Sequence, residues 1–212
     1  MRRSALCAVM VLVSASSVWA GPRDDCANLS GDVAIRACDQ AIRQNPRDVQ
    51  SYHNRGSEYE AKGDLDRALA DFSEAIRLDP KYALAFNGRG IVYKKKGEFD
   101  RAIADYTEAI RLDPRDAKFY YNRGNSYDKK GDDARAIADY TEAIRRNPKY
   151  AKAYFNRGDT YEALGDLDRA HADYSEAIRV DPKYARALMR RGTLHKKKGD
   201  FERALAALTS GS

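Results

Sequence analysis

One ten-residue segment recurs along the chain at a constant interval, and it constrains the fold more than any other feature. Residues 102–111 read AIADYTEAIR, and the same ten residues recur at 136–145, 34 positions later. Close variants occupy residues 68–77 (ALADFSEAIR) and 170–179 (AHADYSEAIR). Prolines at positions 46, 80, 114, 148 and 182 keep the same interval. A period of this length predicts a solenoid, in which copies of one supersecondary unit stack on each other.

Each repeat carries the pattern of two helices. Apolar residues spaced three and four apart predict two amphipathic segments per unit. In the third unit, we expect Gly131 to end the first helix in a left-handed conformation and Asp132 or Asp133 to cap the second. Asp-Pro or Asn-Pro then ends the second helix, because proline lacks the amide hydrogen that would continue it. The sequence therefore predicts an all-α chain of antiparallel helix pairs.

The repeats divide the chain into successive units. Residues 21–48 form an N-terminal segment, expected to be irregular up to Ser30 and then to contain a lone helix over 32–44 that matches the second half of a repeat. Full units follow at 49–82, 83–116, 117–150 and 151–184, and a truncated fifth unit occupies 185–212. The last apolar residues, Ala204, Leu205 and Leu208, have no further unit to cover them. We therefore predict dimerisation through this end.

The first twenty residues have the pattern of a signal peptide. Arg2 and Arg3 precede an apolar run over residues 5–13, and small residues lead to a cleavage site before Gly21. The apolar run is shorter than the roughly 20 residues that a stable membrane anchor needs. We predict that residues 1–20 are removed and that the chain is exported, to the periplasm or the medium. An uncleaved N-terminal anchor is the alternative.

Cleavage would leave Cys26 and Cys38 as the only cysteines. An even number of cysteines in an exported chain predicts a disulfide between them. Two unpaired thiols are the alternative. No CxxC motif or paired histidine spacing is present, so no metal site is expected.

The composition and the motifs argue against an enzyme or a nucleic-acid-binding protein. Charged residues make up 33% of the chain and the net charge is +6, but acids and bases alternate, which is typical of solvated helix surfaces. Gly-rich phosphate loops and the GxSxG and HExxH motifs are missing, so no cofactor is predicted. His195 stands where other units have a tyrosine, such as Tyr59, which predicts a packed or half-buried histidine instead of a catalytic base.

The landmarks within each unit resemble the tetratricopeptide repeat. In the first full unit they are, in order, Tyr52, Gly56, Tyr59, Ala68, Phe72, Ala75 and Pro80. In the second they are Phe86, Gly90, Tyr93, Ala102, Tyr106, Ala109 and Pro114. The resemblance covers nearly all of the chain after the predicted signal peptide. It implies a right-handed superhelix whose first helices line a concave groove for an extended peptide or a partner's helix.

The seventh position of each unit departs from the family, which usually has a large apolar residue there. Here it is an arginine: Arg55, Arg89, Arg123, Arg157 and Arg191. The first four of these units carry an aspartate sixteen residues later, at Asp71, Asp105, Asp139 and Asp173, whereas the fifth has Ala207. We predict an Arg–Asp ion pair across the two helices of each full unit and a less constrained Arg191.

The resemblance also implies which residues face the groove: Tyr121, Asn122, Asn125, Lys152, Phe155, Asn156, Arg186, Met189 and Arg190. Four of them, Asn125, Asn156, Arg186 and Arg190, match positions with which some tetratricopeptide domains hold a peptide's terminal carboxylate. A cation expected at the position of Tyr121 is absent. The alternative is that the asparagines recur for structural reasons and the arginines are solvated.

We therefore predict an exported, non-catalytic scaffold or adaptor that binds a protein or peptide in its groove. The main alternative is a binder of anionic envelope polymers or membrane surfaces through the lysine clusters at 94–96, 129–130 and 196–198. An enzyme with an unrecognised site is a third, weaker alternative.

Overall fold

The computed structural model describes residues 21–210, and its side chains are described up to residue 199 except for residue 198. The predicted signal peptide at 1–20 lies outside the described residues. Over residues 21–210 the chain forms eleven α-helices and no strand. The helices are α1 (Pro22–Asn28), α2 (Gly31–Gln44), α3 (Val49–Ala61), α4 (Leu65–Leu78), α5 (Ala83–Lys95), α6 (Phe99–Leu112), α7 (Ala117–Lys129), α8 (Asp133–Arg146), α9 (Ala151–Ala163), α10 (Leu167–Val180) and α11 (Ala185–Ser210).

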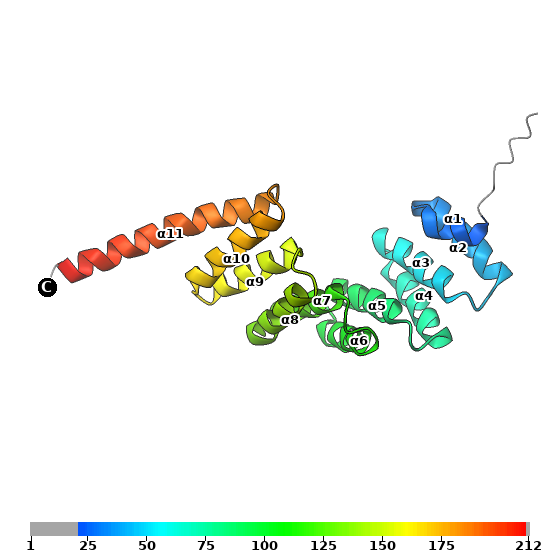
Figure 1. Ribbon diagram of the computed structural model, residues 1–212. Coiled ribbons are helices and arrows are strands. Elements are labelled where there is room, and N and C mark those ends of the chain that lie inside the picture. Colours follow the sequence, from blue (N-terminus) through cyan, green and yellow to red (C-terminus); the bar gives the residue numbers. More distant parts are fainter. Residues whose placement is uncertain (1–20, 211–212) are drawn as a thin grey trace, which may run out of the picture.

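The helices stack as antiparallel pairs along the chain, which confirms the predicted all-α, right-handed solenoid. The pairs α3–α4, α5–α6, α7–α8 and α9–α10 pack most extensively within themselves, and the second helix of each pair packs on the first helix of the next. Figure 1 shows these pairs following one another in a curved row, with α1 and α2 at one end and α11 at the other. None of the described helices is both long enough and apolar enough to cross a membrane.

The turn within the third unit has the predicted chemistry. Gly131 adopts φ of 74°, a left-handed conformation that glycine reaches without a steric cost. The Asp132 side chain then caps α8 by accepting a hydrogen bond from the backbone amide of Arg135 at 3.1 Å. The two helices of the unit therefore turn back on each other within a few residues.

A second glycine lets the two helices approach closely. A Cβ atom at Gly124 would lie 2.9 Å from the ring of Tyr140, closer than side chains pack. Tyr140 and the alanines Ala136 and Ala143 of the same helix are fully or almost fully buried. The core of each unit is therefore an aromatic ring and small residues packed between helices.

The arginine at the seventh position of each full unit forms the predicted ion pair. Arg123 donates from Nε and Nη2 to the two carboxylate oxygens of Asp139, both at 2.8 Å. Equivalent pairs join Arg55 to Asp71, Arg89 to Asp105, and Arg157 to Asp173. Only 17–21% of each arginine side chain is exposed. Each pair is thus a bidentate, largely buried ion pair between the first and second helices of its unit.

The same arginines also contact the preceding unit, a contact that spacing within one unit does not predict. Nη1 of Arg123 donates to Oγ1 of Thr107 at 3.0 Å, and Nη1 of Arg157 donates to Oγ1 of Thr141 at 2.9 Å. Arg89 reaches Ser73 at 3.3 Å, and Arg55 reaches Asp39 at 2.6 Å. One guanidinium therefore connects three helices, two from its own unit and one from the unit before.

Arg191 keeps only the second type of contact. Its Nη1 lies 3.5 Å from Oγ of Ser175 in the preceding unit. Among the side chains that the structure describes, Arg191 has no acidic partner within ion-pair distance. This agrees with the prediction that it is less constrained than the other four.

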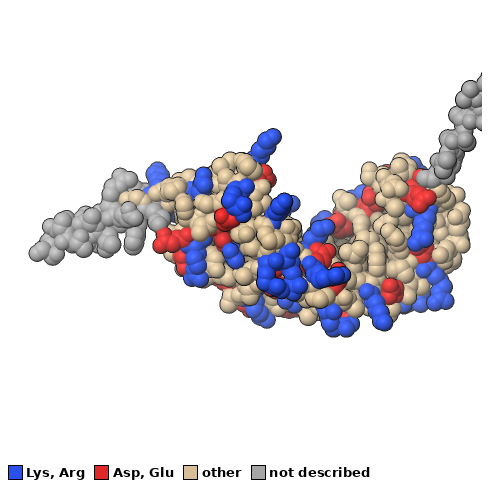
Figure 2. All heavy atoms as spheres, in the orientation of Figure 1, with Lys and Arg blue, Asp and Glu red and all other residues tan. Residues whose placement is uncertain are grey.

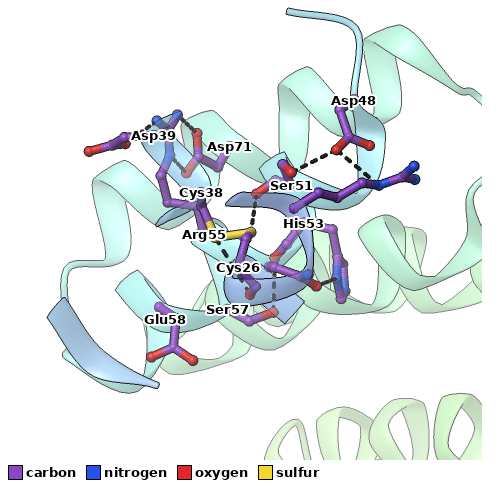
Figure 3. The surroundings of a disulfide bond; sticks show 12 residues. Cys26, Cys38, Asp39, Asp48, Ser51, His53, Arg55, Ser57, Glu58 and Asp71 are labelled. Carbon is purple, nitrogen blue, oxygen red and sulfur yellow. Dashed lines mark hydrogen bonds and ion pairs between the residues drawn. A yellow bond between two sulfur atoms is a disulfide. The ribbon is translucent and has the colours of Figure 1, made fainter. Parts of the chain in front are cut away.

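The prediction of an irregular segment from Gly21 to Ser30 is wrong over α1. Pro22 lies in the first turn of this helix, where its fixed φ suits the helix and its missing amide hydrogen removes no helical bond. The Sγ atoms of Cys26 and Cys38 form a disulfide between α1 and α2 (Figure 3). The lone helix expected over 32–44 is α2, which begins one residue earlier, at Gly31.

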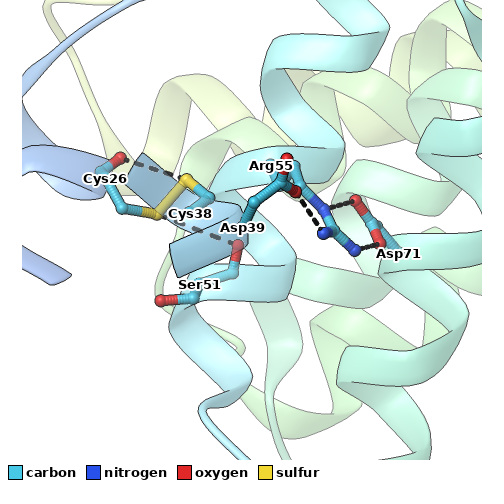
Figure 4. Close-up of polar contacts among 6 residues, drawn as sticks. All are labelled: Cys26, Cys38, Asp39, Ser51, Arg55 and Asp71. Carbon is cyan, nitrogen blue, oxygen red and sulfur yellow. Dashed lines mark hydrogen bonds and ion pairs between the residues drawn. A yellow bond between two sulfur atoms is a disulfide. The ribbon is translucent and has the colours of Figure 1, made fainter. Parts of the chain in front are cut away.

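The disulfide and the first arginine act on the same helix. Figure 4 shows Arg55 between Asp39 of α2 and Asp71 of α4, beside the Cys26–Cys38 bond. α2 is therefore held covalently to α1 and by an ion pair to the first full unit.

The fifth unit does not fold as a helix pair. α11 continues from Ala185 to Ser210 without a break at Gly199, whereas the corresponding glycines of the full units have positive φ. The aspartate that ties the second helix to the first in other units is Ala207 here. The predicted exposure of Ala204, Leu205 and Leu208 concerns side chains outside the described ones.

Replacing Asp139 by alanine tests the ion pair, because it leaves the half-buried Arg123 without its acid. We expect Asp139→Ala to lower the free energy of unfolding by about 3 kcal/mol, the lower end for a broken buried pair. The double change Arg123→Leu with Asp139→Ala, which restores an apolar seventh position, should recover most of this loss. Urea unfolding followed by circular dichroism measures both, and equal losses in the two variants would contradict the interpretation.

Tyr106 provides a second stability test. Its hydroxyl is buried and has no hydrogen-bond partner among the described residues, whereas the hydroxyl of Tyr140 donates to Asn125 at 2.9 Å. The residue corresponding to Asn125 in the second unit is Ile91, which offers no acceptor. We expect Tyr106→Phe to stabilise the chain by about 1 kcal/mol and Tyr140→Phe to destabilise it by about as much. Thermal unfolding measures the stability of both variants. A Tyr106→Phe variant that is less stable than the unsubstituted chain would contradict the interpretation that the buried hydroxyl costs stability.

Candidate functional site

An open groove of about 450 Å³ crosses the first helices of the second to fifth units. It is lined by residues from α5, α7, α9 and α11, together with Phe99 of α6 and Tyr140 of α8. The other lining residues are Lys94, Tyr121, Asn125, Asp128, Lys129, Asn156, Asp159 and Arg186. Four residues expected to face a groove, Tyr121, Asn125, Asn156 and Arg186, are therefore brought together.

A hydrogen-bond network fixes the side-chain amides in the middle of the groove. Asn156 Nδ2 donates to Asn125 Oδ1 at 2.7 Å and to the Tyr121 hydroxyl at 3.2 Å. Asn125 Oδ1 also accepts from the Tyr140 hydroxyl. Within the described residues, Nδ2 of Asn125 and Oδ1 of Asn156 have no partner. The groove thus offers one donor group and one acceptor, the pair needed to bind a peptide group.

The asparagine at the sixth position also links units to each other. Asn122 Nδ2 donates to Asn87 Oδ1 at 2.8 Å, just as Asn156 donates to Asn125 of the unit before. Part of the reason for the recurring asparagine is therefore structural. Asn122 itself points at Asn87 and is not among the residues that line the groove.

The two arginines expected in the groove differ in their surroundings. The guanidinium of Arg186 lies 4.5 Å from the centre of the Phe155 ring, a cation–π arrangement. Nε of Arg190 lies 3.5 Å from Oδ1 of Asp159, which also accepts from the Tyr174 hydroxyl at 2.7 Å. Arg190 is therefore partly neutralised by an acid of its own chain. Arg186 is held on an aromatic ring, and no described carboxylate lies within ion-pair distance of it.

Burial shifts the pKa of two charged groups in the groove. Burial lowers the pKa of the Lys94 ammonium, against the opposing effect of the Glu60 carboxylate, and the nearby cations Lys95 and Lys129 lower it further. Burial raises the pKa of the Asp159 carboxyl, against the opposing effects of the Tyr174 hydrogen bond and of Arg190. Both charged groups lie where little water surrounds them. A charged or hydrogen-bonding ligand therefore interacts with them more strongly than it would at an open surface.

Besides Asn122 and Arg190, three more of the residues expected to face the groove do not line it. Phe155 is fully buried, so the prediction that it faces the groove is wrong: its ring packs against Tyr174 and Tyr184 in the core. Lys152 is exposed and lines a second cleft beside the loops between units, with Arg115, Lys118, Arg146 and Lys149 among its neighbours. Met189 is 67% exposed and does not line the groove.

Sequence reasoning missed Lys94 as a groove residue. It occupies the twelfth position of the second unit, one of the positions that face the groove in the family, so the repeat alignment could have identified it. Its place in a run of three lysines concealed this role. The contributions of Phe99 and Tyr140 come from second helices and were visible only in the fold.

Most other lysines of the clusters form ion pairs with acids of the preceding unit. Lys95 lies 2.5 Å from Glu60, Lys96 lies 2.7 Å from Asp66, and Lys197 lies 2.6 Å from Glu162. Lys130 pairs with Asp100 in the same way as Lys96 with Asp66. Figure 2 shows basic and acidic side chains interspersed over one face, with basic ones gathered near its middle. The clusters therefore carry less free charge than the sequence suggests.

Comparisons with known families agree with the repeat pattern. Models described as TPR repeat match residues 56–97, 92–131 and 124–165. Models described as tetratricopeptide repeat match residues 37–70, 151–184 and 185–210. Together they extend from residue 37 to residue 210. The chain is a tetratricopeptide-repeat protein. No curated protein sequence gives a significant match.

Solved structures of other tetratricopeptide-repeat proteins resemble this one. The crystal structure of MamA is 29% identical over 73% of this chain and 91% of its own, with a TM-score of 0.65. That of YrrB, described as a TPR protein with an unusual peptide-binding site, is 28% identical over 83% and 91%, with a TM-score of 0.66. A thermophilic TPR protein of Thermus thermophilus, 22% identical over 77% and 89% with a TM-score of 0.65, shares the fold.

The raised pKa of Asp159 predicts a pH dependence of stability. Between the ordinary carboxyl value of 3.8 and the raised value, the folded chain holds more protons than the unfolded one, so its stability falls as the pH rises. Asp159→Asn removes this titration. We expect the free energy of unfolding of Asp159→Asn, relative to the unsubstituted chain, to increase with pH through this window and then stay constant. Urea unfolding from about pH 3.5 to about pH 7 measures it, and a difference that decreases with pH would contradict the assignment.

Proposed function

We propose that this tetratricopeptide-repeat protein is an exported, non-catalytic scaffold that binds an extended segment of a protein partner in the groove across α5, α7, α9 and α11. The observation that carries the proposal is the fixed pair of amides, Asn125 and Asn156, with a free donor group and a free acceptor among the described residues of the same groove. Such a pair binds one peptide group of a backbone and is independent of the partner's side chains.

The charges around this pair favour an acidic group next to the bound backbone. Lys94, Lys129 and Arg186 line the groove with Asp128 and Asp159, so the cations are in excess. Arg186 is positioned by the Phe155 ring, which reduces the entropy it would lose on binding. A terminal carboxylate or an acidic side chain would bind Arg186. Arg190 would bind a carboxylate less strongly than the family's carboxylate-binding positions imply, because the Asp159 carboxylate already neutralises part of its charge.

The comparison with YrrB supports a peptide ligand, since that protein is described as having a peptide-binding site and shares this fold. Export is supported by the signal-like pattern at residues 1–20 and by the bonded pair Cys26–Cys38, because disulfides persist in oxidising compartments. Dimerisation through the C-terminal repeat remains a prediction, to be measured by light scattering with Leu205 and Leu208 changed to serine.

The alternative of anionic polymers or membrane surfaces has less support, because Lys95, Lys96, Lys130 and Lys197 are paired within the chain. Salt distinguishes the two functions. Binding through surface lysines would weaken strongly with ionic strength, whereas binding through the half-buried amides of the groove would change less.

Affinity selection from a random peptide library tests the proposal. The chain from Gly21 to Ser212 is the bait, and the affinity of each selected peptide is measured by calorimetry. We expect Asn125→Ala with Asn156→Ala to weaken binding by about tenfold or more, since two hydrogen bonds are lost. We expect Arg186→Ala to weaken only peptides with an acidic group.

Arg179→Ala is the matched control for Arg186→Ala. Arg179 is an exposed arginine of α10 that pairs with Glu176 on its own helix and does not line the groove. Its replacement should leave the affinity unchanged. Selected peptides that bind the double amide variant as tightly as the unsubstituted chain would place the binding surface elsewhere and refute the proposal.

A further inference from the structure

We propose that His171 and His195 form a binding site for a divalent transition-metal ion such as Zn²⁺, Ni²⁺ or Cu²⁺, which bridges α10 and α11. The Nε2 atoms of the two imidazoles face each other at 3.1 Å. The ring centres are 4.6 Å apart and the ring planes are inclined by 74°. The two residues are 24 positions apart in the sequence and come from neighbouring helices of the fourth and fifth units.

The distance fits two ligands of one metal ion. Imidazole nitrogens bind zinc at about 2.0–2.1 Å, so two ligands at angles between square and tetrahedral are separated by roughly 2.9–3.4 Å. The observed 3.1 Å lies within this range. Two neutral imidazoles at this distance can share one proton at most, whereas a metal ion between them accepts the lone pair of each.

The repeat pattern shows that the pair is a double replacement at one interface. At the position of His171, earlier units have Leu69, Ile103 and Ile137. At the position of His195, the units that follow them have Tyr93, Tyr127 and Tyr161. Both positions change from an apolar or aromatic residue to histidine only where α10 meets α11. An isolated substitution in a packed interface would change one partner, whereas here both partners carry an imidazole.

The composition of the site indicates which ions it would take. Two imidazoles leave coordination positions that water can occupy, and the described side chains contain no cluster of three potential ligands. His195 is exposed, so the prediction that it is packed or half-buried is wrong, and His171 is half-buried; the site is therefore open to water. Two imidazoles and water suit exchangeable binding of Cu²⁺, Ni²⁺ or Zn²⁺, and copper should bind most tightly. Ca²⁺ and Mg²⁺ prefer oxygen ligands and should not bind.

A bridging ion would affect the groove through α11. This helix carries Arg186 and also Arg190, which pairs with Asp159 of α9. At this junction, among the described side chains, Arg191 of α11 makes only the single polar contact with Ser175 of α10 that joins its unit to the one before. The metal ion would add a second link between α10 and α11, and would hold Arg186 in place on the groove.

Zinc titration of the chain without an affinity tag tests the proposal. The variants His171→Leu and His195→Tyr restore the residues found in the other units, so both are expected to fold. By isothermal titration calorimetry we expect one Zn²⁺ per chain, and a loss of affinity of about tenfold or more in either variant. Zn²⁺ should also raise the melting temperature of the unsubstituted chain and of neither variant, and EDTA should reverse the rise.

Two further measurements decide the ligands. The electron paramagnetic resonance spectrum of the Cu²⁺ complex should show two equatorial imidazole nitrogens in the unsubstituted chain and one in each variant. Mg²⁺ at the same concentration should give neither heat nor a change in melting temperature. Equal Zn²⁺ affinity in the chain and in both variants, or an unchanged copper spectrum in the variants, would overturn the proposal.

Discussion

The stacking of this molecule depends on one guanidinium group per unit. A large apolar residue at the seventh position would contact its neighbours without direction, whereas arginine has three nitrogens that point to fixed places. Two of them bind the aspartate of the second helix, and the third binds a hydroxyl or carboxylate of the preceding unit. Because the same bonds recur at each junction, the relative orientation of the units repeats, and a groove forms along their first helices.

Both ends of the array follow from this interaction. At the N-terminus, α2 provides Asp39 for Arg55, and the disulfide adds α1, so that a half-unit completes the first junction. At the other end Arg191 contacts Ser175 but has no aspartate, and α11 continues as one helix where the other units turn. The histidine pair lies at this same junction. The last helix therefore keeps the arginine contact with the preceding unit and adds the histidine pair.

Some side chains both pack the units together and shape the groove. Asn156 links its unit to the one before, yet lines the groove with a side-chain oxygen that has no partner among the described residues. Phe155 belongs to the core, but its ring supports Arg186. The residues that stack the units are thus the residues that position the ligand-binding groups, so changes in the stacking of the units are expected to alter the groove.

The repeat interval, the glycines and the prolines were enough to predict the helix pairs and the Arg–Asp pairs, because these depend on spacing within one unit. Contacts between units could not be predicted in the same way. The bond from Arg123 to Thr107, the burial of Phe155 and the pairing of Lys95 with Glu60 depend on the angle at which units stack, which no single unit contains. The helix α1 and the unbroken α11 were missed because the repeat pattern fades at both ends. The sequence by itself determined the unit and its internal links. The tertiary structure decided which polar groups in the groove remain available to a ligand. A hydrogen bond between units occupies either the amide nitrogen or the amide oxygen of an asparagine side chain and leaves the other atom for a ligand.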